Sequence, residues 1–520
     1  MTQSKSLQAM RMQVQWNRLL AIVEEQAQTL LRTSFSTIVR ECGDLSTGIF
    51  DSEGKMLAQA VTGTPGHVNT MAASVRHFLR HFPRETIREG DIYATNDPWM
   101  GTGHLNDFVV VTPMFHRGAL VALLCCTSHL MDVGGLGYGP DGRDIFMEGI
   151  CVPPVRLAQD GQISATLMAV IKGNTRLPVE TEGDIYSLVN SNEVGIRGLK
   201  TMLDEFGMPD LADLSRHILD TTATAARAQL EALRPGSYSY SMQVDGYDHP
   251  VVIAATTVIG DKGIHVDFSG SSEPSQFGIN VPLTYASAYS TFGLMSALMP
   301  QIPNNSGSLD LFTVSAPDDC ILNATRPAPV AIRHVLGQMI PDVIFGCIRQ
   351  FAPDKVPAEG ASCLWNINLR GRTDQGNPFA ITVTTNGGTG ARPGKHGLSV
   401  TSYPSGVRGT PIEILEAAMP MVFWKKEIRE NSGGRGRWNG GDGVELMAQN
   451  CSDRTIELLA AFDRIGHPAR GIDAGQDGAP GYVGLSTGET LSGKGLQPIR
   501  PGQTLVIRTP GGGGIGKCGP

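Results

Sequence analysis

Two apolar runs joined by a tight polar turn constrain the fold of this chain more than any other segment. The runs are Phe108–Phe115 and Ala119–Thr127, and His116-Arg117-Gly118 separates them. Apolar runs of strand length on either side of a short turn that contains glycine predict an antiparallel β-hairpin. If the strands pair about Arg117, residue 107 faces roughly residue 127, and residue 104 faces roughly residue 130. The two ends of the segment 101–132 then meet at one mouth of the hairpin.

Side chains of the metal-ligand type stand at both ends of this predicted hairpin. His104 and Asp107 precede the first run, and His129 and Asp132 follow the second. Two imidazoles and at least one carboxylate at one mouth are a donor set that binds divalent metal ions. His104, Asp107 and His129 are therefore the candidate ligands, and Asp132 either replaces Asp107 or orients His129 from behind. The alternative is that these side chains serve only the structure of the loops.

The rest of the chain contains both helical and strand patterns. Helical periodicity occurs at 9–34, 68–82, 180–234 and 335–351, and strand patterns occur at 44–60, at 236–290 and beyond about 375. These patterns predict an α+β fold with mixed, largely antiparallel sheets and several long helices. The break at Arg234-Pro235-Gly236 divides the chain into an N-terminal metal-bearing region, 1–235, and a C-terminal strand-rich and glycine-rich region, 236–520.

Glycine accounts for 63 of the 520 residues, without a fixed period. Its clusters at 387–392, 432–436 and 440–443 could let the backbone approach a ligand closely, but they are interpreted as tight turns between strands. The segment 511–518 nearly spells a phosphate-binding loop. However, Cys518 stands where the magnesium-binding hydroxyl belongs, and Pro510 precedes the segment where a buried strand would be expected. We therefore expect no ATP site on this chain.

Charge and cysteine usage narrow the class of protein. The net charge of −8 argues against nucleic acid or an anionic membrane surface as a partner. The nine cysteines form no C-x-x-C pair, and the chain has neither a secretory segment nor an 18-residue apolar run. A cytoplasmic protein with reduced thiols follows from this pattern. The adjacent Cys125 and Cys126 are expected to be small buried side chains.

Seven segments, in order along the chain, resemble the hydantoinase B/oxoprolinase family. They are ECGDLSTGIFD, TNDPWMGTGHLNDFVVVTPMF, SHLMDVGG, IFMEGICVPPVRL, NGGTGARPGKHG, ENSGGRGRWNGGDGVE and TPGGGGIG, and the resemblance extends from about residue 10 to the last residues. The family includes the B subunits of N-methylhydantoinase, the matching half of 5-oxoprolinase, and the metal-bearing subunits of acetone and acetophenone carboxylases. It usually reads GGTHLPD where this chain reads GTGHLND, so the spacing of His104 and Asp107 is kept.

The resemblance implies a hydantoinase B-like fold and a two-chain mechanism. A hydantoinase A-type ATPase subunit would use ATP and Mg²⁺ to phosphorylate a lactam or enol oxygen, and the B-type chain would hold a divalent metal (Zn, Mn or Fe). The metal ligands of the family fall on Asp44, His104, Asp107 and His129. Asp44 is added by the resemblance alone.

The function expected from these observations is that of the metal-bearing B subunit of an ATP-dependent cyclic-amide hydrolase in a hetero-oligomer. Asp132 or Glu148 would take a proton during catalysis, although Glu148 could equally be a solvated carboxylate. Two alternatives stay open at this point. One is a subunit of an ATP-dependent ketone carboxylase, and the other is a non-catalytic scaffold whose metal is structural.

Overall fold

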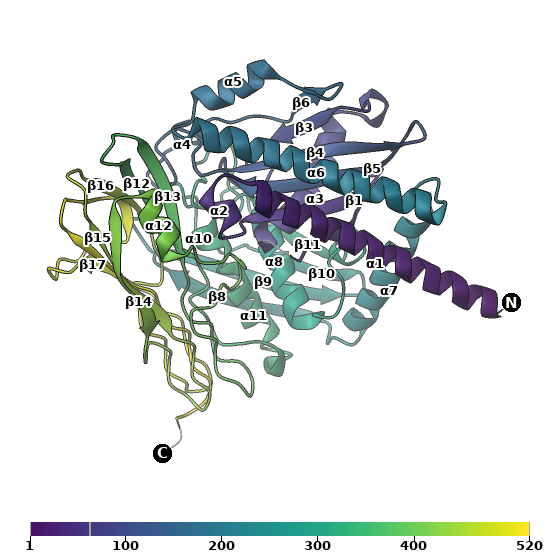
Figure 1. Ribbon diagram of the computed structural model, residues 1–520. Helices are drawn as coiled ribbons and strands as arrows, with labels where there is room; N and C mark the ends of the chain where they lie inside the picture. Colours follow the sequence, from purple (N-terminus) through teal and green to yellow (C-terminus); the bar gives the residue numbers. More distant parts are fainter. Residues whose placement is uncertain (1, 62–63, 519–520) are drawn as a thin grey trace.

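The predicted hairpin forms the middle of a seven-stranded antiparallel sheet in the computed structural model (Figure 1), which describes residues 2–61 and 64–518. The strand order is β2-β1-β5-β4-β3-β6-β7. The strands are β1 (Leu45–Asp51), β2 (Met56–Gln59), β3 (Ile92–Thr95), β4 (Asp107–His116), β5 (Ala119–His129), β6 (Val155–Gln159) and β7 (Gln162–Ile163). The hairpin predicted at 44–60 is β1–β2, which pairs with β5.

The register of the β4–β5 hairpin differs from the predicted one by two residues. Asp107 faces His129, not residue 127, and Leu130 N donates to Asn106 O over 2.7 Å. One residue of the shift comes from the turn, which contains only Arg117 and Gly118, both with positive φ (51° and 80°). The other comes from a β-bulge between Met114 and Phe115. Together these irregularities set a candidate carboxylate directly opposite a candidate imidazole.

Helices cover both faces of this sheet, which explains why β4 and β5 read as continuous apolar runs. α1 (Thr2–Thr33) and α6 (Pro178–Phe206) pack on one face, and α3 (Pro65–His81) packs on the other (Figure 1). Alternation along β5 directs Cys126 towards α1 and α6, and Cys125 towards α3. Both thiols are fully buried, as predicted.

The second sheet has four strands from the middle of the chain and packs against helices of the same region. Its order is β11-β10-β9-β8, and the β10–β11 pair is parallel. Its strands are β8 (Gly236–Val244), β9 (Val251–Gly260), β10 (Gly263–Asp267) and β11 (Phe312–Ser315). The strand pattern was predicted to continue up to residue 290, but α8 (Leu283–Leu298) already begins at Leu283.

The helix predicted at 335–351 is divided into α10 (His334–Gly337) and α11 (Ile340–Ile348). Pro341 lies in the first turn of α11, where a residue without an N–H is tolerated. The remaining helices are α2 (Thr37–Arg40), α4 (Ile145–Glu148), α5 (Ala165–Gly173), α7 (Ala212–Glu231), α9 (Ser306–Leu309) and α12 (Ile412–Ala418), with 3₁₀ turns at Arg84–Thr86 and Pro353–Lys355.

Two further antiparallel sheets form the C-terminal part of the fold, on the left in Figure 1. One has the order β13-β12-β16-β18 and the other β14-β15-β19-β17. Their strands are β12 (Trp365–Arg372), β13 (Pro378–Thr385), β14 (Met421–Arg429), β15 (Gly443–Asn450), β16 (Ile456–Ala461), β17 (Tyr482–Leu485), β18 (Lys494–Ile499) and β19 (Thr504–Arg508).

The glycine clusters do not form the tight turns that the sequence predicted. They form a glycine bundle, in which the segments 387–390, 432–441, 471–478 and 511–514 are hydrogen-bonded side by side. The segment 511–514 is hydrogen-bonded to two of the others: Gly512 N donates to Gly441 O (3.0 Å), Gly434 N to Gly512 O (2.8 Å), and Gly514 N to Gln476 O (2.9 Å). The backbones lie so close that a Cβ on Gly512 would overlap the Thr389 carbonyl. Glycine is therefore required here for close approach.

The structure confirms an α+β fold with largely antiparallel sheets. The division at residue 235 stays a prediction. α7 ends at Glu231 and β8 begins at Gly236, but Ala324 and Val330 return to pack in the core of the N-terminal sheet. Among the described residues, every helix is too short or too polar to cross a membrane.

Candidate metal centre

His104, Asp107 and His129 converge at the mouth of the β4–β5 hairpin. One donor atom from each lies within 4.8 Å of the others, and all three side chains are buried. Asp107 is the first residue of β4, His129 is the last residue of β5, and His104 lies in the loop just before β4. The antiparallel register therefore brings together the three residues that the sequence selected.

The hydrogen bonds of His104 fix which of its nitrogens is free. Its Nδ1 lies 2.9 Å from Ala331 O, and because a carbonyl only accepts, Nδ1 carries the proton. Burial, with the nearby Arg333 charge, lowers the pKa of His104 to about 3, which keeps the ring neutral. The lone pair of Nε2 is then only 2.8 Å from Asp107 Oδ1. Two facing lone pairs at this distance repel each other unless a cation lies between them.

Other buried polar atoms around Asp107 also lack a hydrogen-bond partner among the described residues. They are His129 Nε2, His67 Nδ1 and Asp44 Oδ1, in addition to His104 Nε2. Unpaired buried polar atoms are costly, and a cluster of them calls for a bound group. The donor set of imidazole nitrogens and carboxylate oxygens therefore fits a divalent metal.

Asp44, which the family resemblance added to the ligand set, lies beside this cluster. It immediately precedes β1, and its backbone oxygen accepts from His129 N at 3.2 Å. Its Oδ1 lies 3.5 Å from His67 Nδ1. Asp44 is thus within reach of the site through strand pairing between β1 and β5.

Two residues that the sequence did not select complete the surroundings of Asp107. His67, in the first turn of α3, has Nε2 at 3.0 Å from Asp107 Oδ2, and Arg333 donates from Nη2 to the same oxygen at 2.6 Å. Burial alone would raise the pKa of Asp107, but His104, His67 and Arg333 together hold it well below its ordinary range. Burial likewise opposes protonation of His67, but the carboxylates of Asp107 and Asp44 raise its pKa. Asp107 is therefore ionised, and its Oδ2 contacts both the Arg333 guanidinium and the His67 imidazole.

An aromatic wall closes the site opposite Asp107. The Tyr138 ring lies 4.8 Å from the ring of His129 and 5.7 Å from that of His104, centroid to centroid. Its hydroxyl is 3.1 Å from His334 Nδ1. Burial and the charge of Arg333 hold the pKa of His334 well below its ordinary value. His334 is therefore a neutral partner for the Tyr138 hydroxyl, another residue that local sequence patterns did not indicate.

Asp132, one of the two candidate proton carriers, is bound to the segment that follows α5. Its Oδ2 accepts from Thr175 Oγ1 (3.0 Å) and from Arg176 N, and its Oδ1 pairs with the Arg176 guanidinium. These contacts fasten the loop after β5 to the start of α6.

Glu148, the other candidate proton carrier, is buried behind His104. Its Oε1 accepts from Ala331 N at 2.9 Å, and the carbonyl of the same Ala331 accepts from His104 Nδ1. Burial raises the pKa of Glu148 to about 8, although hydrogen bonds from Ala331 and Val330 oppose the shift. The carboxyl group is thus mostly protonated at neutral pH. Through the backbone of Ala331 it helps to fix the position of the His104 ring.

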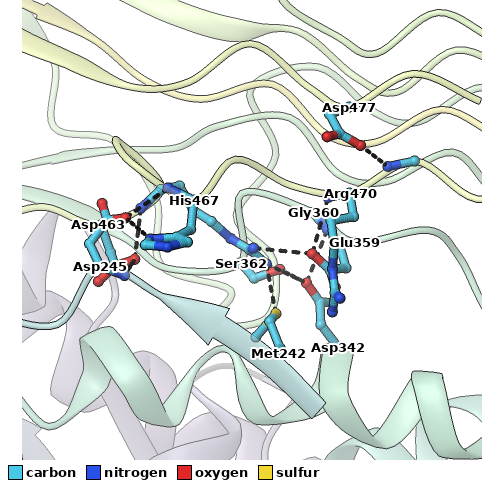
Figure 2. A network of polar contacts seen from close by, with 12 residues as sticks. Met242, Asp245, Asp342, Glu359, Gly360, Ser362, Asp463, His467, Arg470 and Asp477 are labelled. Atoms are coloured by element: carbon cyan, nitrogen blue, oxygen red, sulfur yellow. Dashed lines mark hydrogen bonds and ion pairs between the residues drawn. The ribbon is translucent and has the colours of Figure 1, made fainter. Parts of the chain in front are cut away.

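A second buried polar network lies away from the candidate metal centre and joins α11 to the segment 463–477 (Figure 2). The fully buried Arg464 donates to Glu359 Oε2 (3.1 Å) and Asp342 Oδ2 (3.4 Å). Asp245 accepts three successive backbone N–H groups, from residues 465 to 467. These contacts anchor the strand-rich C-terminal part of the chain to the second sheet.

Comparison with known proteins places these features in context. The sequence profile of the family described as "Hydantoinase B/oxoprolinase" matches residues 8–518. The 5-oxoprolinase 1 of Arabidopsis thaliana is 28% identical over 96% of this chain, which spans only 41% of that protein. Caprolactamase subunit beta of Pseudomonas jessenii is 26% identical over 95% of this chain and 88% of its own length.

Solved structures show the same architecture. The crystal structure of the ATP-dependent caprolactamase from Pseudomonas jessenii superposes with a TM-score of 0.91 at 25% identity, covering 98% of this chain and 91% of that chain. A nucleotide-free acetone carboxylase structure superposes with a TM-score of 0.83 at 17% identity, over 97% of this chain and 75% of that one. The second likeness concerns the fold alone.

Proposed function

Because this chain belongs to the hydantoinase B/oxoprolinase family, we propose that it is the metal-bearing subunit of an ATP-dependent cyclic-amide hydrolase of the hydantoinase or 5-oxoprolinase type. The observation that carries the proposal is the pair of facing lone pairs on His104 and Asp107, beside the free nitrogen of His129. The similarity to an ATP-dependent caprolactamase supports the substrate class, since caprolactam is a cyclic amide.

The proposed metal ligands are Asp44, His104, Asp107 and His129. Two imidazoles and carboxylate oxygens suit Zn²⁺, Mn²⁺ or Fe²⁺. A bound divalent ion would supply Lewis acidity for attack of water on the activated ring carbon. Arg333, paired with Asp107, keeps this carboxylate ionised and fixed in orientation.

Of the two candidate proton carriers, Glu148 is better placed than Asp132 to influence the site. Both oxygens of Asp132 are occupied by Thr175 and Arg176, whereas Glu148 Oε2 is buried without a partner among the described residues. With a pKa of about 8, Glu148 holds a proton at neutral pH. Because it reaches His104 only through Ala331, we assign it a positioning role.

The proposed partner is a hydantoinase A-type ATPase subunit that binds ATP and Mg²⁺ and phosphorylates the lactam oxygen. The lengths of the relatives support a second chain, because this chain spans 88% of a caprolactamase subunit but only 41% of a 5-oxoprolinase. We propose a cytoplasmic hetero-oligomer, in agreement with nine cysteines that are all free thiols.

Replacement of His104 or His129 by Ala tests the proposal. Each variant should lose bound metal and ATP-coupled ring opening together, measured by elemental analysis and by product formation on a panel of lactams with the partner ATPase. His116→Ala is the matched control, because His116 ends β4 at the opposite end of the hairpin from His104 and His129. Full activity in either test variant would disprove the proposal. Metal loss with unchanged ring opening would mean a structural metal, and incorporation of labelled bicarbonate would mean a ketone carboxylase.

A further inference from the structure

One face of β12 carries a polar stripe that leads away from the metal centre. Side chains alternate along a strand, so Ile367 and Leu369 point into the core, and the opposite face presents the stripe residues Asn366, Asn368, Arg370 and Arg372. Asn368 Nδ2 donates to Tyr138 O at 2.9 Å, and Arg370 Nη1 donates to Leu136 O. The stripe therefore follows the loop that joins His129 to Tyr138, the residue that walls the metal centre.

The outer end of this stripe opens into an arginine-lined cavity of about 480 Å³. Four arginines line it, and Glu457 is the only acidic residue among its lining residues; the arginines are Arg176, Arg370, Arg372 and Arg454. Phe379 and Pro378 supply an apolar wall. A concentration of arginines on a chain of net charge −8 requires an explanation beyond solubility.

Two of these arginines are held in place from behind. Arg370 Nε pairs with Glu457, which faces it across the β12–β16 ladder, and Arg176 is fixed by Asp132 and by the Gly134 carbonyl. Each guanidinium has five N–H donors, which is more than these contacts use, and both arginines line the cavity.

The other two arginines make weaker contacts with neighbouring residues. Among the residues that the structure describes, Arg372 donates only to the Gly376 carbonyl, and Arg454 lies 3.5 Å from Asp453, whose side chain is 83% exposed. Surface pairs of this kind contribute little binding energy and are easily exchanged for a better anion. The cavity thus combines two fixed guanidinium groups with two available ones.

We propose that the arginine-lined cavity binds the phosphoryl group of a small molecule, either a phosphate monoester or free inorganic phosphate. Planar guanidinium groups bind phosphate oxygens in pairs, which makes arginine the side chain suited to this anion. The inference rests on the proposed function, because phosphorylation of the ring oxygen would supply such a group and its hydrolysis would release phosphate. The stripe on β12 contacts the candidate metal centre at Asn368, through Tyr138, and reaches the cavity at Arg370 and Arg372.

Direct titration of the full chain with inorganic phosphate and with phenyl phosphate tests the inference, using calorimetry without metal or partner. Arg372→Gln and Arg454→Gln should each weaken binding about tenfold or more. Arg500→Gln, an exposed arginine at the end of β18, is the matched control and should bind as the parent does. Tighter binding of phenyl phosphate would identify the activated substrate as the ligand, and equal or weaker binding would identify released phosphate.

Equal affinity in the parent and both test variants would overturn the inference, as would absence of binding at millimolar phosphate. Binding to the isolated chain that disappears in the complex with the ATPase partner would also overturn it, because the arginines would then form a docking surface. His104→Ala should retain phosphate binding. Failure of the metal proposal and failure of this inference are therefore distinguishable.

Discussion

The carboxyl group of Glu148 should make the stability of this protein depend on pH in an unusual direction. Its side chain is 4% exposed, and burial raises its pKa from an ordinary value of 4.5 to about 8. Between these two values the folded chain binds a proton that the unfolded chain releases. The stabilisation is complete below pH 4.5, decreases as the pH rises, and is lost once the pH passes about 8.

The size of the effect follows from the width of that interval. Each pH unit corresponds to about 1.4 kcal/mol, so an interval of about 3.5 units corresponds to about 5 kcal/mol in the free energy of unfolding. Glu148→Gln removes the titrating group and keeps an oxygen that accepts from Ala331 N. Relative to the parent, the variant should gain about 1.4 kcal/mol per pH unit from pH 4.5 to 8.

Urea denaturation of metal-free parent and variant at several pH values between 4.5 and 9 measures this difference directly. Taking the difference cancels the contributions of all other titrating groups. Replacement of the exposed Glu205 by Gln is the matched control, and its profile should run parallel to that of the parent. Parallel profiles for Glu148→Gln and the parent would refute the reasoning, because the buried carboxyl would then titrate alike in both states.

Three further predictions concern the buried charges and the glycine bundle. Asp107→Asn leaves Arg333 buried without its carboxylate and should lower the free energy of unfolding by about 3–5 kcal/mol in urea titrations at pH 7; a loss below 1 kcal/mol would contradict the pairing. Arg464→Met leaves two buried carboxylates without their shared cation and should cost a similar amount by the same assay, whereas a neutral result would show that the network is replaceable. Gly388→Ala places a Cβ against the Gly441 carbonyl and should lower the free energy of unfolding by about 3 kcal/mol or more. The control is Gly260→Ala, whose Cβ meets open space. Similar thermal denaturation of the two variants would show that the backbone of the bundle can shift to accommodate the Cβ.

Local patterns in the sequence predicted the elements of this fold well, and the convergence of the metal-type residues followed from them. The apolar runs of β4 and β5 specify a hairpin by themselves, so His104, Asp107 and His129 could be brought together without knowledge of the rest of the chain. The pairing was wrong by two residues, because a two-residue turn and a bulge depend on backbone angles that the apolar pattern does not encode.

The parts that sequence reasoning missed depend on contacts between distant segments. Arg333 lies 226 positions after Asp107, and no local periodicity connects the two. His67 lies in an ordinary first turn of a helix, and it reaches Asp107 only because α3 packs against the sheet. The glycine clusters were wrongly taken for turns, because turns and close-packed extended segments require the same freedom from a Cβ.

The glycine bundle also has a consequence for the order of assembly. Its segments begin at residue 387, and the one that touches all the others, 511–514, is near the end of the chain. During synthesis the first three segments emerge before the segment that contacts each of them. This common neighbour becomes available only after residues 511–514 have been synthesised, whereas every strand of the seven-stranded sheet ends by Ile163, so the bundle is completed after that sheet has emerged.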